Sequence, residues 1–175
     1  MVGETIPRAL FASNERMAVL RLEGPVRYTT ARALRSFIDC AFLREPTELV
    51  VLDLRATTFV DSTGIGLIAR AGRLALQRSG RRAVILSLET DVMTVLRSAA
   101  LDVLFAVVEE PPGELPSELA EIPLGQTIVD ADGAAGRVIL EAHHDLAALS
   151  EKNGDEYRDV IAALEAELAA TRQTS

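Results

Sequence analysis

The chain has 175 residues, enough for one domain and an extension, and its 49% of apolar residues rules out wholesale disorder. Its single cysteine, Cys40, excludes a disulfide framework and a cysteine-based zinc site. It has no run of about 18 apolar residues, and its first residues lack the basic segment and apolar stretch of a secretory signal. We therefore expect a soluble cytoplasmic protein.

The net charge of −8 is unevenly divided along the chain. Residues 1–110 carry 14 arginines against 13 acidic side chains, whereas residues 111–175 carry four basic side chains against 13 acidic ones. A chain with this balance is not expected to bind nucleic acid through a basic surface. Four of the seven prolines lie between residues 111 and 123, where they disfavour regular structure. We predict a domain over residues 1–110, a proline-rich linker over 111–126 and a helical extension over 127–175.

Strand and helix patterns alternate before the linker. The expected strands are 9–13, 17–24, 49–54, 83–88 and 104–108, with a hairpin turn at 14–16 between the first two. Three helices are expected between the strands: one through Phe42 capped by Thr29 or Thr30, one from Asp61 or Ser62 to a stop at Gly80, and a short one from Asp91 to Leu96. This order predicts an α/β fold, a mixed β-sheet with right-handed crossovers and helices packed on it.

Two helices are expected in the extension, each with one apolar stripe. The first stripe is Ile139, Ala142, Leu146 and Leu149, and the second is Tyr157, Ile161, Leu164 and Leu168. We expect Asn153 and Gly154 to end the first helix and Asp155 to cap the second. Two such helices are only marginally stable alone, so this C-terminal helical hairpin must pack on another surface.

Ser62 is the most informative candidate site. It follows a buried strand and a short polar loop, and it is expected at a helix N-terminus, where unpaired N–H groups and the helix dipole favour an added phosphate. Gly64 and Gly66 keep the first turns free of side-chain bulk, so another protein can approach the serine. The alternative is a plain helix cap, since Ser and Asp cap many helices.

The helix after Ser62 is apolar on two sides. Ile65, Ile68 and Leu76 are expected to face the sheet, whereas Leu67, Ala71 and Leu74 fall almost opposite, where a surface helix is normally polar. Two interpretations follow. Either this second stripe, flanked by Arg70, is a docking surface for a partner protein, or the C-terminal hairpin covers it and brings acidic side chains close to the arginines.

The segment from the buried strand into this helix resembles the STAS domain of bacterial anti-sigma factor antagonists, in which a Leu-Asp-Leu strand precedes F-x-D-S-[ST]-G-[IL]-G. The matching residues are Asp53, Phe59, Asp61, Ser62, Thr63, Gly64, Ile65 and Gly66. The resemblance extends over about residues 9–109 and implies a STAS fold. It also implies that Ser62 is phosphorylated, that Thr63 is a lesser phosphoacceptor and that Asp61 positions the serine hydroxyl. Asp53 either lines this site or accepts hydrogen bonds from loop N–H groups.

The same resemblance implies a function in partner switching. The unphosphorylated protein binds and sequesters an anti-sigma factor, a GHKL-type serine kinase that phosphorylates Ser62 and is thereby released. A metal-dependent serine phosphatase restores the serine. Residues 138–168 are similar to the tail of a pseudomonad and related proteobacterial subgroup, whose members work with a response regulator carrying the phosphatase and kinase functions. A further partner of the phosphorylated form is conceivable in such a pathway.

Two other functions are weighed against this one. A STAS scaffold in a larger signalling assembly never becomes phosphorylated. A serine hydrolase would use Ser62, but the chain has no G-x-S-x-G elbow, P-loop or dinucleotide fingerprint, and both histidines lie beyond the proline-rich segment. We therefore expect no catalytic residues, cofactor or metal. His143 and His144 are adjacent on a helix and are expected to be solvated or to face a partner.

Overall fold

The computed structural model describes residues 6–42, 44, 47–88, 91–125 and 134–173. Its strands are β1 (Arg8–Ser13), β2 (Met17–Val26), β3 (Leu49–Asp53), β4 (Thr57–Val60), β5 (Ala83–Leu86), β6 (Phe105–Val108) and β7 (Ala120–Ile122). They form a mixed sheet in the order β6-β5-β3-β2-β1-β7, with β4 paired to β2. The β2, β3, β5 and β6 ladders are parallel, and β1 is antiparallel to both of its neighbours.

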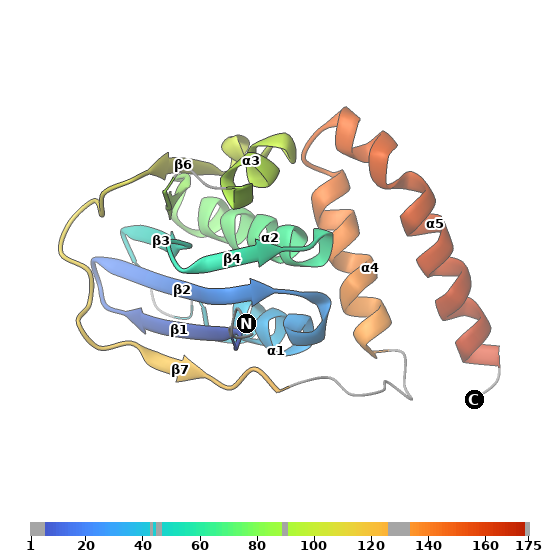
Figure 1. Ribbon diagram of the computed structural model, residues 1–175, viewed down its shortest axis with the longest axis horizontal. Coiled ribbons are helices and arrows are strands. Elements are labelled where there is room, and N and C mark those ends of the chain that lie inside the picture. Colours follow the sequence, from blue (N-terminus) through green and yellow to red (C-terminus); the bar gives the residue numbers. More distant parts are fainter. Residues whose placement is uncertain (1–5, 43, 45–46, 89–90, 126–133, 174–175) are drawn as a thin grey trace, which may run out of the picture.

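The predicted α/β architecture is confirmed. The helices are α1 (Tyr28–Cys40), α2 (Ser62–Ser79), α3 (Asp91–Ser98), α4 (Ala134–Ala147) and α5 (Glu151–Gln173), with a short 3₁₀ helix at Leu101–Val103. α1 and α2 pack against each other and bury one face of the sheet, including Leu20, Leu52 and Ile85. α4 lies between this domain and α5, so the extension is a helical hairpin placed at one end of the domain (Figure 1).

The other face of the sheet explains why β3 is apolar at successive positions. Val51 and Leu86 are fully buried on this face, where Leu115 and Leu119 from the proline-rich segment pack against them. The same segment continues into β7, which pairs with β1. The prediction that Leu104–Val108 is the last strand is wrong, because Ala120–Ile122 add a further strand at the free edge of β1.

β4 is a second strand that the sequence pattern does not predict. The first half of the long strand β2 pairs with β3, and its second half pairs with β4 from Gly24 to Val26. The sequence predicts only a short polar loop between Leu54 and Phe59, whereas Thr57–Val60 form a strand of which the two end residues are buried. This short strand is what carries the chain from the sheet to the start of α2.

The start of α1 also differs from its prediction. The helix begins at Tyr28 after an N-cap, Arg27, that has no side-chain cap, so neither Thr29 nor Thr30 caps it. Instead, the Tyr28 N–H donates a 2.8 Å hydrogen bond to Asp61 Oδ2. A residue distant in sequence therefore satisfies a helix end that local spacing could not assign.

The junction of α4 and α5 was placed too late in the sequence. α4 ends at Ala147, and Ser150 precedes α5 and accepts a 3.2 Å hydrogen bond from the Asn153 N–H. Asn153 is buried inside the first turn of α5, where its Nδ2 donates to the carbonyl oxygens of Ala99 (2.9 Å) and Leu146 (3.1 Å). Asn153 therefore ties the hairpin to the end of α3 rather than ending a helix.

None of the helices in the described part of the chain combines the length and the apolar character needed to span a membrane.

Candidate functional site

Asp61 organises the N-terminus of α2. Its Oδ1 accepts a 2.8 Å hydrogen bond from the Gly64 N–H, which confirms Asp61 as the cap, and its Oδ2 accepts the bond from Tyr28. The carboxylate thus joins the starts of α1 and α2. Ser62 is the first residue of α2 and is half-buried, whereas Thr63 is 3% exposed. Of the two predicted phosphoacceptors, only Ser62 is near the surface.

The Ser62 hydroxyl meets a histidine from the extension. Ser62 Oγ lies 3.0 Å from His143 Nε2, and His143 Nδ1 lies 2.8 Å from the Ile139 carbonyl oxygen. A carbonyl only accepts, so Nδ1 carries a proton, and in the neutral ring Nε2 accepts from the serine hydroxyl. His143 is 4% exposed, with its ring edge against Tyr157. The expectation of a solvated or partner-facing His143 was wrong.

A signal for this contact was present in the sequence. Ile139, Ala142, His143 and Leu146 have the spacing i, i+3, i+4 and i+7 of one helix face, so His143 belongs to the apolar stripe of α4. Its neighbour His144 is exposed and lies 3.5 Å from Glu165. The pattern could place His143 on the packed side of the helix, but nothing local could identify Ser62 as its partner.

The second apolar stripe of α2 is buried, and α4 packs on a neighbouring face of the same helix. Leu67 and Ala71 are buried, and Leu74 is partly buried against the core. Gly66 faces the backbone of Ala142 so closely that a Cβ there would lie 2.1 Å from the Ala142 carbonyl oxygen. Leu67 and Ala71 thus belong to the core of the domain, and α4 packs on the neighbouring face of α2 through Ser62, Gly66, Arg70 and Arg73. Gly66 permits this close approach of the two helices.

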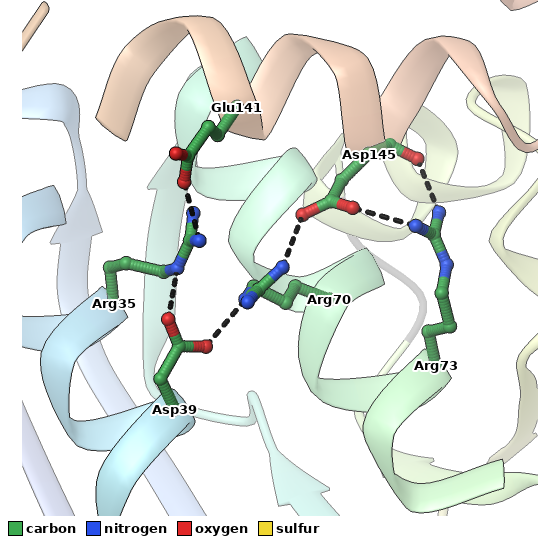
Figure 2. A network of polar contacts seen from close by, with 6 residues as sticks. All are labelled: Arg35, Asp39, Arg70, Arg73, Glu141 and Asp145. Atoms are coloured by element: carbon green, nitrogen blue, oxygen red, sulfur yellow. Dashed lines mark hydrogen bonds and ion pairs between the residues drawn. The ribbon is translucent and has the colours of Figure 1, made fainter. Parts of the chain in front are cut away.

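Ion pairs border this contact, as the charge pattern predicted. Figure 2 shows Asp145 of α4 between two arginines of α2, with Arg70 Nη1 at 3.3 Å and Arg73 Nη1 at 2.6 Å from its carboxylate. Arg73 also donates to the Asp145 carbonyl oxygen at 2.8 Å. Asp39 of α1 pairs with both Arg35 and Arg70 at 2.5 Å, and Arg35 pairs with Glu141 of α4. The network links α1, α2 and α4.

The network also sets the ionisation of Asp39. Partial burial raises the pKa of its carboxyl, but the hydrogen bonds and charges of Arg70 and Arg35 lower it by more, so the pKa lies below its ordinary value. Beside the network, a surface hollow of about 390 Å³ is lined by Asp39, Arg70, Arg73, Leu74 and Gln77. This hollow is the part of the predicted partner surface that α4 leaves open.

Two exposed aromatic side chains lie at the Ser62 end of α2. Phe59, three residues before Ser62, is 46% exposed, and Tyr28, whose backbone is bonded to Asp61, is 57% exposed. The Arg27 guanidinium lies 5.0 Å from the Phe59 ring centroid. Neither Tyr28 nor Arg27 is predicted from the sequence as a surface residue of the site. Exposed aromatic side chains are typical of a protein contact surface.

Asp53 has a structural position in the sheet. Its carboxylate is buried and accepts hydrogen bonds from Arg21 Nε (2.8 Å) and from Arg55 Nε and Nη2 (both 2.9 Å). The Arg55 N–H adds a longer bond of 3.3 Å, so a loop N–H group does contact this residue. The carboxylate is thus held by two arginines that flank the end of β3.

Acid is expected to destabilise the protein through Asp53. Burial raises the pKa of this carboxyl, but the hydrogen bonds from Arg55 and Arg21 lower it by more, to below its ordinary 3.8. Because the folded-state pKa is the lower one, this stabilisation is complete above pH 3.8 and is lost as the pH falls through the folded-state pKa. We predict that Asp53→Asn lowers the unfolding midpoint at pH 6 and that its stability then falls less steeply in acid than that of the exposed control Asp155→Asn. Equal acid limbs in the two variants would contradict this.

Comparison with known proteins places this site in a family context. Residues 9–111 match the model of the STAS domain. A 66-residue stretch is 35% identical to an anti-sigma F factor antagonist from Paenibacillus polymyxa, covering 38% of this chain and 56% of that protein. The chain thus spans little more than half the length of this relative. The structure of the anti-sigma factor antagonist SpoIIAA in its unphosphorylated form is 22% identical with a TM-score of 0.41, over 51% of this chain and 81% of that one.

Proposed function

Because the chain belongs to the STAS domain family, whose model matches more than half of its residues, we propose that it is an anti-sigma factor antagonist in a partner-switching pathway. In this proposal the unphosphorylated form binds and sequesters an anti-sigma factor, and phosphorylation of Ser62 releases it. The observation that carries the proposal is the position of Ser62, half-buried at the first residue of α2 beside the exposed Phe59. The similarity to an anti-sigma F factor antagonist supports the choice of partner.

Charge explains why a phosphate would act as a release signal. Phosphorylation adds about −1.5 to −2 charges next to Asp61, whose carboxylate already occupies the capping position. The helix dipole favours an anion at this end of α2 by only about 0.3–1 kcal/mol. Burying the phosphate against a partner without a matching cation costs several times more, so the complex dissociates. The fold of the domain does not need to change.

The proposed partners follow from this cycle. The anti-sigma factor is a GHKL-type serine kinase, and a metal-dependent serine phosphatase fused to a response regulator returns Ser62 to its free form. The exposed aromatics Phe59 and Tyr28 and the hollow beside Arg70 and Leu74 make up the proposed partner surface. Leu67 and Ala71, which the sequence also suggested, are buried in the core and are not part of this surface.

We propose a binding protein rather than an enzyme. Ser62 and His143 lie at the distance of a nucleophile and its base. The position of the histidines beyond the proline-rich segment therefore does not by itself exclude catalysis. However, His143 is held by the Ile139 carbonyl oxygen and not by a carboxylate, and α4 lies over the serine where a substrate would have to bind. This arrangement suits a covered contact site.

Capture of partners by the full chain tests the proposal. The matched variants are Ser62→Asp and Ser62→Asn. The aspartate adds a negative charge, and the asparagine has the same size as the aspartate but no charge. We expect wild type and Ser62→Asn to retain an anti-sigma factor with kinase activity, and Ser62→Asp to bind it roughly 30-fold or more weakly, because an unpaired charge at an interface costs about 2 kcal/mol or more. Equal retention by all three chains would contradict a phosphorylation switch and favour a scaffold.

A further inference from the structure

Three contacts between α2 and α4 lie on one line along α2. Ser62 meets His143, Gly66 meets the backbone of Ala142, and Arg70 meets Asp145. Residues 62, 66, 70 and 73 are spaced by one turn each and share one face of the helix, and Arg73 completes the contact with Asp145. The extension therefore covers a continuous stripe of α2 that begins at the proposed phosphorylation site.

The covered stripe limits what can reach Ser62. A protein kinase must bring a base and the γ-phosphate of ATP into line with Ser62 Oγ, whose hydrogen bond is already made to the buried His143. A docking protein would meet the backbone of α4 at Gly66 before it meets α2. Both events need the space that α4 occupies.

We infer that the C-terminal hairpin is an internal competitor for the partner surface, so that its seating on α2 excludes both partner docking and a negative charge on Ser62. This inference rests on the proposed function, because it names the regulation of the same site. The closed hairpin reduces the apparent affinity for a partner to the intrinsic affinity multiplied by the fraction of molecules that are open. Its acidic side chain Asp145 and its small Ala142 fit the arginines and the glycine of α2 as a partner helix would.

The chemistry of the Ser62–His143 contact explains why charge opens the hairpin. His143 Nε2 accepts the serine proton, and a phosphoserine ester oxygen has no proton to donate. With the Nδ1 proton held at the Ile139 carbonyl oxygen, Nε2 faces residue 62 as the acceptor of the serine hydroxyl proton. An anion at residue 62 therefore lacks this hydrogen bond, and it would be buried between α2 and α4 without a compensating partner. The inner face of α4 then becomes exposed in the phosphorylated form.

Hydrogen exchange of the full chain tests this inference without any partner. We compare Ser62→Asp with Ser62→Asn, whose side-chain amide can still donate to His143 Nε2. We expect the amides of residues 134–147 to exchange about tenfold faster or more in Ser62→Asp than in Ser62→Asn, which stays close to wild type. Amides of β2 and β3 serve as the internal reference, and unchanged exchange there shows that the domain is folded.

The outcomes separate the inference from the proposed function. Equal exchange of residues 134–147 in Ser62→Asp and Ser62→Asn would overturn the inference, whatever the capture experiment retains. Faster exchange in Ser62→Asp supports it even if no chain captures an anti-sigma factor, which would count only against the proposed function. Fast exchange in both variants would also overturn it, because loss of the serine and not charge would then open the hairpin.

Discussion

Gly66→Ala is expected to unseat the C-terminal hairpin while leaving the domain folded. The new Cβ would lie 2.1 Å from the carbonyl oxygen and 2.6 Å from the carbonyl carbon of Ala142. These are backbone atoms of a helix, so α4 cannot yield locally as a flexible side chain would, and it must move away as a unit. Alanine meanwhile raises the helix propensity of α2 by about 1 kcal/mol relative to glycine.

Hydrogen exchange and thermal unfolding measure this effect. We expect exchange of residues 134–147 to rise about tenfold or more, while the amides of β3 and β5 keep their protection. Gly154→Ala is the matched control, since it is also a glycine inside a helix and its new Cβ would lie 3.7 Å from the Ala147 carbonyl oxygen, an ordinary contact. A Gly66→Ala chain whose α4 stays as protected as in the control would show that the close helix contact is not as described.

Asp145→Arg is expected to open the same contact by charge. Asp145 is largely buried, and its carboxylate accepts hydrogen bonds from Arg70 and Arg73. The substitution therefore replaces this carboxylate with a third guanidinium, which repels the other two. Losing one partner of a buried pair costs about 3–5 kcal/mol. The two arginines are each 32% exposed and keep part of their hydration, so we expect about 2–3 kcal/mol less stability of the seated hairpin.

The control for Asp145→Arg is Asp155→Arg, which makes the same change of charge at an exposed position of α5. We expect the control to unfold within about 0.5 kcal/mol of wild type, because an exposed ion pair contributes little. Differential scanning calorimetry and exchange of α4 amides distinguish the two variants. If Asp145→Arg and Asp155→Arg unfold alike, the network around Asp145 does not hold the hairpin on α2.

Local rules were sufficient where a structure is held by its own neighbours in sequence. The bounds of α2 follow from the Asp61 cap and from Gly80, which takes a left-handed conformation with φ of 68°. The buried strands β3 and β5 follow from their apolar runs, and the turn before β2 follows from Asn14, whose side chain accepts from the Arg16 and Met17 N–H groups. The apolar stripe of Leu67 and Ala71 indicated a covered face.

Long-range contacts decided the features that were missed. β7 forms a strand because its backbone pairs with the edge strand β1. α1 starts at Tyr28 because Asp61 accepts a hydrogen bond from the Tyr28 N–H. Asn153, followed by glycine, resembled a helix stop, but its side chain finds two carbonyl oxygens that exist only in the folded hairpin. The Ser62–His143 contact joins residues 81 positions apart, and no spacing rule relates them.

The most direct test of a shared surface is the affinity of the full chain for the anti-sigma factor retained in the capture experiment. The dissociation constant is measured for wild type and for Asp145→Arg, whose change lies on the hairpin and outside the proposed partner surface. We predict that Asp145→Arg binds about tenfold more tightly or better, because its α2 face is already uncovered. An Asp145→Arg chain that exchanges its α4 amides rapidly yet binds no more tightly than wild type would contradict competition between the hairpin and the partner.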